Sequence, residues 1–120
     1  MHKEKRQYTR SPSIFDLKVT DRDTLLVIGY LLDISSGGLG VISDDPIGTD
    51  RLFRLELTVP LDEKHPDVIA FDAKSIWCQK APQLELYHTG FQFMKLSDRA
   101  NEALEALRRD DFLMTVAGTR

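Results

Sequence analysis

The clearest strand signal in this sequence is the stretch Phe53-Arg54-Leu55-Glu56-Leu57-Thr58-Val59. Its apolar and polar side chains alternate without interruption. Successive side chains of a β-strand point to opposite faces, so this period of two predicts a strand with one face in a hydrophobic core and the other in water. The stretch indicates a β-rich domain, and the segments on either side of it show related patterns.

Further strands are expected at residues 14–20, 24–34, 39–43, 68–79 and 86–94. Turns rich in Asp, Ser, Gly and Pro separate most of them. Together with the first stretch, they predict a mainly β fold, a six-stranded antiparallel β-barrel. Closure is favoured because an open sheet of this size would leave exposed edge strands.

Only the C-terminal part of the chain has a helical pattern. Its apolar stripe consists of Ala100, Ala103, Leu104 and Leu107. These positions follow the spacing of one helix face, and Ser97 suits the N-cap. The pattern predicts a C-terminal α-helix over about residues 97–112 that caps the barrel.

Charge is distributed unevenly along the chain. The net charge is −3, from 16 Lys and Arg against 19 Asp and Glu. The first ten residues hold four basic side chains against Glu4, a local charge of +3, which leaves −6 for the rest. Pro12 and the lack of an apolar stripe favour a flexible N-terminal arm over residues 1–12, followed by a single domain over residues 13–120. The acidic body argues against broad binding to DNA or RNA, whereas the basic arm suits one small anion.

Composition excludes several classes of protein. Apolar residues make up 42% of the chain and charged residues 29%, the balance of a soluble globular protein. Cys78 is the single cysteine, which excludes an internal disulfide or a thiolate metal cluster, and it is expected to be an inert strand residue. No apolar run approaches the ~20 residues that span a bilayer, and no secretory signal is visible. We therefore expect a cytoplasmic protein without metal, cofactor or membrane partner.

No catalytic motif stands out in the sequence. The chain around Ser35 and Ser36 is Asp-Ile-Ser-Ser-Gly-Gly, which differs from the Gly-x-Ser-x-Gly of a hydrolase. Gly38-Leu39-Gly40 lacks the third glycine and the following helix of a dinucleotide fingerprint, and no P-loop is present. Sequence alone does not exclude a role for His88. An enzyme built on a small barrel is the least favoured alternative.

Two segments remain as candidate binding sites. The first is Arg6-Gln7-Tyr8-Thr9-Arg10, and the second is Asp33-Ile34-Ser35-Ser36-Gly37-Gly38, which joins two predicted strands. Taken separately, the first is typical of a solvated terminus and the second of a hairpin turn. Together, Arg6-x-x-x-Arg10 and Asp33-x-Ser35-x-x-Gly38 resemble the paired signature of PilZ domains, bacterial receptors for the second messenger cyclic di-GMP.

The resemblance extends beyond the two motifs. The stretches that are similar to recurrent strand patterns of the family are Leu39-Gly40-Val41, Ile76-Trp77 and Gly90-Phe91-Gln92-Phe93. The similarity covers residues 5 to about 110, practically the whole chain. It implies a PilZ-like barrel of the split-barrel type.

The resemblance also implies roles for the polar motif residues. Arg6 and Arg10 would bind guanine and phosphate, since the arginine fork matches the acceptor edge of guanine and the oxygens of phosphate. Asp33 would accept hydrogen bonds from the N1–H and N2–H₂ groups of guanine. Ser35 would offer its hydroxyl to the ligand, most plausibly to phosphate.

The resemblance implies a backbone role for the two glycines of this segment. Gly38, together with Gly37, would let the backbone pass close to the ligand or adopt a positive φ. Ser36 occupies an unconstrained position of the motif and is a minor candidate.

The implied function is that of a receptor that performs no chemistry. Cyclic di-GMP would order the N-terminal arm, and the reorganised surface would change contacts with a downstream protein in motility or biofilm regulation. We expect a monomer or weak dimer. The alternative is a PilZ-fold protein-interaction module that does not bind cyclic di-GMP. Trp77, Phe71, Phe91 and Phe93 are expected to pack in the barrel rather than to stack on bases.

Overall fold

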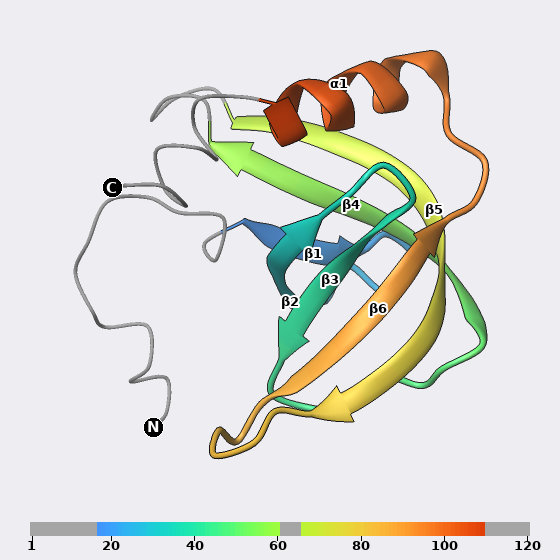
Figure 1. The fold of residues 1–120 in the computed structure, drawn as a ribbon. Helices are drawn as coiled ribbons and strands as arrows, with labels where there is room; N and C mark the ends of the chain where they lie inside the picture. Colours follow the sequence, from blue (N-terminus) through green and yellow to red (C-terminus); the bar gives the residue numbers. More distant parts are fainter. Residues whose placement is uncertain (1–16, 61–65, 110–120) are drawn as a thin grey trace, which may run out of the picture.

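Six antiparallel strands close into a barrel in the computed structural model, which describes residues 17–60 and 66–109 (Figure 1). The strands are β1 (Lys18–Asp21), β2 (Val27–Ile34), β3 (Gly38–Ser43), β4 (Arg51–Pro60), β5 (Pro66–Lys80) and β6 (Tyr87–Phe93). Their order around the barrel is β1-β2-β3-β6-β5-β4, and pairing of β1 with β4 closes it. The predicted fold class is confirmed. The predicted arm lies outside the described residues.

The start of β2 differs from the sequence-based prediction. It begins at Val27 rather than at Thr24, because the residues before it form a loop after β1. The Asp21 carboxylate accepts hydrogen bonds from the backbone N–H groups of Asp23 (2.8 Å) and Thr24 (3.3 Å). These bonds use the N–H groups of Asp23 and Thr24 within the loop. Leu25, two residues before the strand, has a φ of 66°.

The barrel interior holds the hydrophobic core that the alternation predicts. On β4, Leu55, Leu57 and Val59 are buried, whereas the intervening polar side chains are not. Phe71 and Phe91 are each 3% exposed, so their predicted place in the core is confirmed. Phe93 is partly buried against this core, and its ring meets that of Phe71 edge-on at 5.5 Å between centroids.

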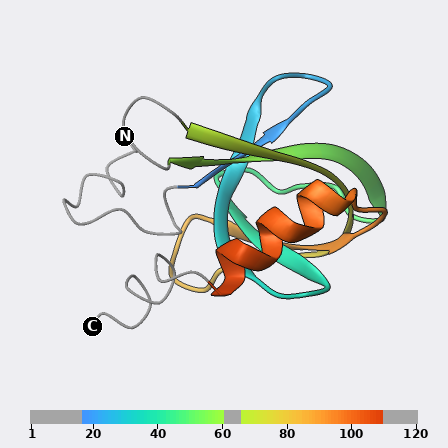
Figure 2. The same cartoon turned by 90° about the horizontal axis from the view of Figure 1, so that it is seen from above.

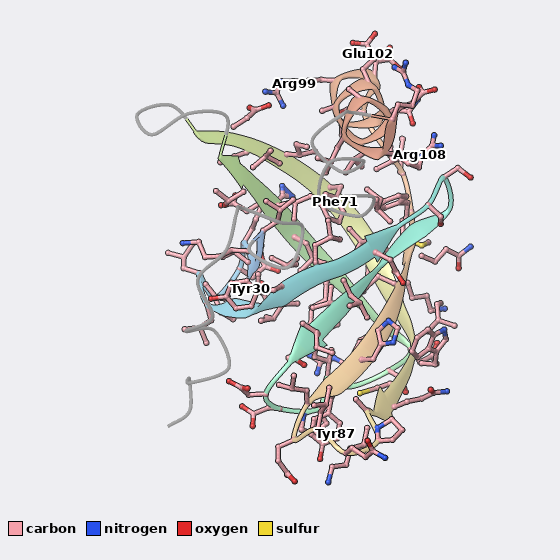
Figure 3. The ribbon with its side chains drawn as sticks, turned by 60° about the vertical axis from the view of Figure 1, so that its left-hand side comes forward. Tyr30, Phe71, Tyr87, Arg99, Glu102 and Arg108 are labelled. Atoms are coloured by element: carbon pink, nitrogen blue, oxygen red, sulfur yellow. The ribbon has the colours of Figure 1, made fainter. Side chains whose placement is uncertain are left out.

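Helix α1 (Asp98–Arg109) covers one end of the barrel (Figure 2). Ala100, Leu104 and Leu107 are buried in the same core as the strands, which explains the apolar stripe. The Ser97 hydroxyl accepts a hydrogen bond from the Ala100 N–H (3.0 Å), the geometry of an N-cap. In Figure 3, Glu102 points away from the strands. The predicted helix and its cap are confirmed for the described residues.

The described part of the chain contains no helix that is long and apolar enough to cross a membrane. Within residues 17–60 and 66–109, His, Cys, Asp and Glu side chains form no group of three or more that would hold a metal ion. Cys78 is a partly buried free thiol on β5.

Candidate functional site

Ser35, Ser36 and Gly37 connect β2 to β3 in a tight turn, and the segment from Asp33 to Gly38 is called here the 33–38 turn. The backbone N–H of Ser35 donates a hydrogen bond to the Gly38 carbonyl oxygen (2.8 Å). The Ser35 hydroxyl donates to the same oxygen over 3.3 Å, a long distance for an O–H donor. The hydroxyl therefore makes only a weak contact within the turn.

The two glycines of the turn face different surroundings. A Cβ atom on Gly38 would overlap with the carbonyl oxygen of Phe91 on β6, whereas one on Gly37 would meet nothing within 4 Å. No glycine among the described residues has a positive φ, so that part of the prediction is wrong. The missing side chain of Gly38 serves the close approach of β3 to β6.

A β-bulge turns the Asp33 side chain to the outside of the barrel. Leu31 pairs with Val41 and Asp33 with Gly40, so β2 has one extra residue, Leu32, at this point. Strict alternation would place Asp33 on the same face as Leu31, which is fully buried. The extra residue reverses this orientation, and Asp33 is exposed.

A second bulge, on β5, turns the Trp77 side chain to the outside of the barrel. Ser75 pairs with Phe91 and Trp77 with Gly90, with Ile76 as the extra residue. Ser75 is fully buried, whereas Trp77 is 40% exposed. Trp77 was predicted to pack in the barrel, and it lies on the outer surface instead of in the interior, because the bulge interrupts the alternation of β5.

The two bulges create a row of facing residues across four neighbouring strands. Asp33 of β2 pairs with Gly40 of β3, Gly40 with Gly90 of β6, and Gly90 with Trp77 of β5. Paired residues of adjacent strands present their side chains on the same face. We call these four residues the outer row. Its two central members have no side chain, and neighbouring side chains occupy the space that this leaves: Oδ1 of Asp33 and Nε2 of His88 lie over Gly40, and the Trp77 indole lies over Gly90.

A pocket of about 310 Å³ lies over the outer row, a volume within the range of small-molecule sites. Its lining consists of Asp33, Ser35, Gly37, Gly38, Leu39, Gly40, Ile76, Trp77, His88, Gly90, Phe91 and Gln92. The structure thus brings four of the predicted site residues into one pocket. Ser36 is exposed and does not line it, and Arg6 and Arg10 lie outside the described residues.

Sequence reasoning missed the β5 and β6 side of this pocket. The alternation of β6 contained one usable signal, because His88, Gly90 and Gln92 alternate with the inward-facing Thr89 and Phe91. Nothing in the local pattern showed that Gly90 lies between Gly40 and Trp77, since strand register is set by pairing.

The pocket offers acceptors and flat surfaces rather than positive charge. Asp33 supplies a carboxylate, Trp77 an indole and His88 an imidazole, and the lining holds no Lys or Arg among the described residues. Such a lining suits a flat ligand with hydrogen-bond donors on its edge. A ligand that is also an anion needs cationic side chains from another part of the chain.

Comparison with known proteins gives one family and a shared fold. The model of the PilZ domain family matches residues 4–109. No curated protein matches the sequence. At 23% identity and a TM-score of 0.61, the structure resembles that of the Bacillus subtilis inhibitor of motility, MotI/DgrA, over 87% of this chain and 50% of that one. It resembles the PilZ domain of YcgR from Escherichia coli, solved with c-di-GMP, at 18% identity and a TM-score of 0.56 over 78% of each chain. The chain spans about half the length of MotI/DgrA.

Proposed function

The chain belongs to the PilZ domain family, and from this premise we propose that it binds cyclic di-GMP at the pocket beside the 33–38 turn. One observation carries the proposal. The pocket on the barrel surface is lined by Asp33, Ser35 and Gly38, the three fixed positions of the motif that the sequence singles out, and by the neighbouring Gly37. The family is one of ligand-binding effector domains rather than of enzymes, so binding alone is the proposed activity.

The chemistry of the pocket supports a guanine base as the ligand group. The exposed Asp33 carboxylate accepts hydrogen bonds from the N1–H and N2–H₂ donors that guanine presents side by side. The phosphates of the ligand require cations, which we assign to Arg6 and Arg10, because no Lys or Arg lines the described part of the pocket.

We propose that binding is read out through the N-terminal arm. Arg6 and Arg10 would close over the ligand, and the ordered arm would change the contacts of this surface with a downstream protein. Regulation of motility or biofilm formation is the process that we propose, in the cytoplasm and with the receptor as a monomer or weak dimer. MotI/DgrA, which shares the fold, is itself described as an inhibitor of motility.

Titration calorimetry with cyclic di-GMP tests this function. We expect Arg6→Ala and Arg10→Ala each to weaken binding by about 1–3 kcal/mol, the scale of a bidentate arginine–guanine contact. Lys3→Ala, which removes one positive charge from the same arm, is the matched control and should have a much smaller effect. Cyclic di-AMP and GTP serve as ligand controls.

The result also decides between this function and its alternative. Unchanged affinity in both arginine variants would remove Arg6 and Arg10 from the site. Absence of binding by the folded wild-type protein would favour the protein-interaction module that does not take the ligand.

A further inference from the structure

His88 is the one side chain in the described lining of the pocket that can become a cation. That lining contains two titratable side chains, Asp33 and His88, and no Lys or Arg. Imidazole is the side-chain group whose charge ordinarily changes between pH 5 and pH 8. Any positive charge that this part of the pocket offers to an anionic ligand therefore depends on a proton bound to His88.

The imidazole of His88 has an unused hydrogen-bonding atom. Its Nε2 atom is buried and has no hydrogen-bond partner among the described residues. A buried polar atom without a partner costs free energy. The nitrogen would therefore gain stabilisation from a partner that comes within hydrogen-bond distance.

The carboxylate of Asp33 lies close to this nitrogen. Oδ1 of Asp33 is 2.5 Å and Nε2 of His88 is 2.7 Å from the point that a Cβ atom of Gly40 would occupy. The two atoms are therefore at most about 5.2 Å apart, the sum of the two distances. Rotation of either side chain can bring them within hydrogen-bond distance, because no side chain of Gly40 separates them.

The other groups around His88 on the paired strands include one charged side chain. They are Tyr30 of β2, Ile42 of β3, Tyr87 of β6, and Trp77, Cys78, Gln79 and Lys80 of β5. The charged one, Lys80, forms an ion pair with Glu85 at 3.8 Å. Asp33 is therefore the counter-charge that an imidazolium at position 88 would meet.

A ligand at Asp33 would change the surroundings of this pair. Asp33 is exposed, so water screens the interaction of its charge with other groups. A guanine over Asp33 excludes that water, and the phosphates of the ligand bring negative charge into the pocket. Both changes favour a proton on His88. The carboxylate has about four acceptor positions, so it can accept a hydrogen bond from His88 and from guanine together.

We propose that His88 takes up a proton when cyclic di-GMP binds, and that its imidazolium donates a hydrogen bond from Nε2 to Asp33 and holds the carboxylate toward guanine. This inference rests on the proposed function, because it assumes cyclic di-GMP at Asp33. His88 is a positioning residue, since it acts on the base through Asp33. Because binding takes up a proton, the affinity for the ligand rises as the pH falls.

The pH dependence of binding tests this coupling. By titration calorimetry, we expect the Kd of the wild-type protein for cyclic di-GMP to fall about 5- to 10-fold from pH 8.0 to pH 6.0, the lower part of the usual range for coupled sites. At pH 7.0, titrations in phosphate and in Tris, two buffers with different ionisation enthalpies, should show uptake of a fraction of a proton for each ligand bound.

His88→Gln separates the proton from the hydrogen bond. Its amide can still donate to Asp33 but takes up no proton. We expect the Kd of this variant to change less than about 2-fold over the same pH range, with no proton uptake. The matched control is His65→Gln, which removes a histidine that is not part of the pocket lining and should keep the pH dependence of the wild type.

A measurement without ligand tests the role of Asp33. At pH 6.0, the NMR chemical shifts of the imidazole C–H protons give the fraction of His88 that carries a proton. We expect a smaller fraction in Asp33→Asn than in the wild type, because the counter-charge is removed. Asp23→Asn removes a carboxylate that lies outside the pocket lining and should leave the fraction unchanged.

The outcomes distinguish this inference from the proposed function. Suppose that the wild type binds and Arg10→Ala weakens binding, but the Kd is constant or rises as the pH falls, or follows pH equally in His88→Gln. The proton coupling is then wrong and the receptor function stands. Equal protonated fractions in Asp33→Asn and the wild type would overturn Asp33 as the partner of His88. No binding by the folded wild type at either pH overturns both proposals.

Discussion

Three glycines near the pocket differ in what an added methyl group would meet. At Gly37 it would meet nothing within 4 Å, at Gly38 the backbone of Phe91, and at Gly40 the ends of two side chains. None of the three has a positive φ, so backbone strain does not distinguish them. Alanine substitution therefore tests only the steric space at each position. We expect its effects on stability and on ligand affinity to differ among the three positions.

Gly38→Ala should destabilise the fold, whereas Gly37→Ala should not. The methyl group at position 38 would overlap with the Phe91 carbonyl oxygen, and relief requires β3 and β6 to move apart. We expect the free energy of unfolding to fall by about 1–3 kcal/mol, as in other overpacked sites. Gly37→Ala should stay within about 0.5 kcal/mol of wild type. Urea denaturation measures both, and equal stabilities would contradict the assigned packing role.

Gly40→Ala should impair binding with little loss of stability. Its methyl group would displace Oδ1 of Asp33 and Nε2 of His88, which are side-chain atoms that can rotate away. We expect cyclic di-GMP to bind about 1–3 kcal/mol more weakly, because Asp33 is moved from its position toward guanine. Gly48→Ala is the control, since that residue precedes β4 outside the pocket lining. Wild-type affinity in Gly40→Ala would place the ligand away from Asp33.

At the scale of elements, the two bulges position the site. The bulge on β2 exposes Asp33 and the bulge on β5 exposes Trp77, while their neighbours Leu31 and Ser75 remain fully buried. One extra residue in a strand reverses the faces of the residues that follow. The barrel thus keeps an apolar interior and presents a polar and an aromatic side chain on one outer surface.

Helix α1 depends on its first turn for part of its stability. The Ser97 hydroxyl accepts a hydrogen bond from the Ala100 N–H. Ala100 and Leu104 are both buried. We expect Ser97→Ala to lower the free energy of unfolding by about 1 kcal/mol. Ser97→Asp should have a stability close to that of wild type, because Asp also caps helices well. Urea denaturation compares the three proteins. An alanine variant as stable as wild type would show that the cap contributes nothing.

At the scale of the whole molecule, closure of the barrel gives the pocket a rigid floor. Every strand pairs on both sides, including β1 with β4, and β3 and β6 lie side by side beneath the pocket (Figure 1). A floor built from paired backbone requires little reorganisation when a ligand binds.

Ligand binding should therefore appear as a gain in stability of the whole domain. A ligand that binds only the folded state at 100 times its Kd raises the free energy of unfolding by about 2.7 kcal/mol, and the melting temperature by several degrees. We expect this rise with cyclic di-GMP and none with GTP in differential scanning fluorimetry. Arg10→Ala should show a smaller rise at the same ligand concentration. An equal rise with GTP would contradict selectivity for the cyclic dinucleotide.

Local residue order was enough to predict the barrel and the capping helix. Alternation at Phe53-to-Val59 and the stripe around Leu104 report local periodicity, which a chain carries in its order of residues. The 33–38 turn was predictable for the same reason, because its residues are contiguous and their turn preferences are local.

The residues that lie opposite the 33–38 turn follow from strand pairing and not from local residue order. Gly40 is adjacent to Gly90, and Gly90 to Trp77, through pairing across strands that are distant in the sequence. The bulges that turn Asp33 and Trp77 outward likewise exist only where the register between two paired strands shifts. Register and bulges depend on long-range pairing rather than on local residue order, and for that reason the local pattern of β5 did not predict that Trp77 lies on the outer surface of the barrel.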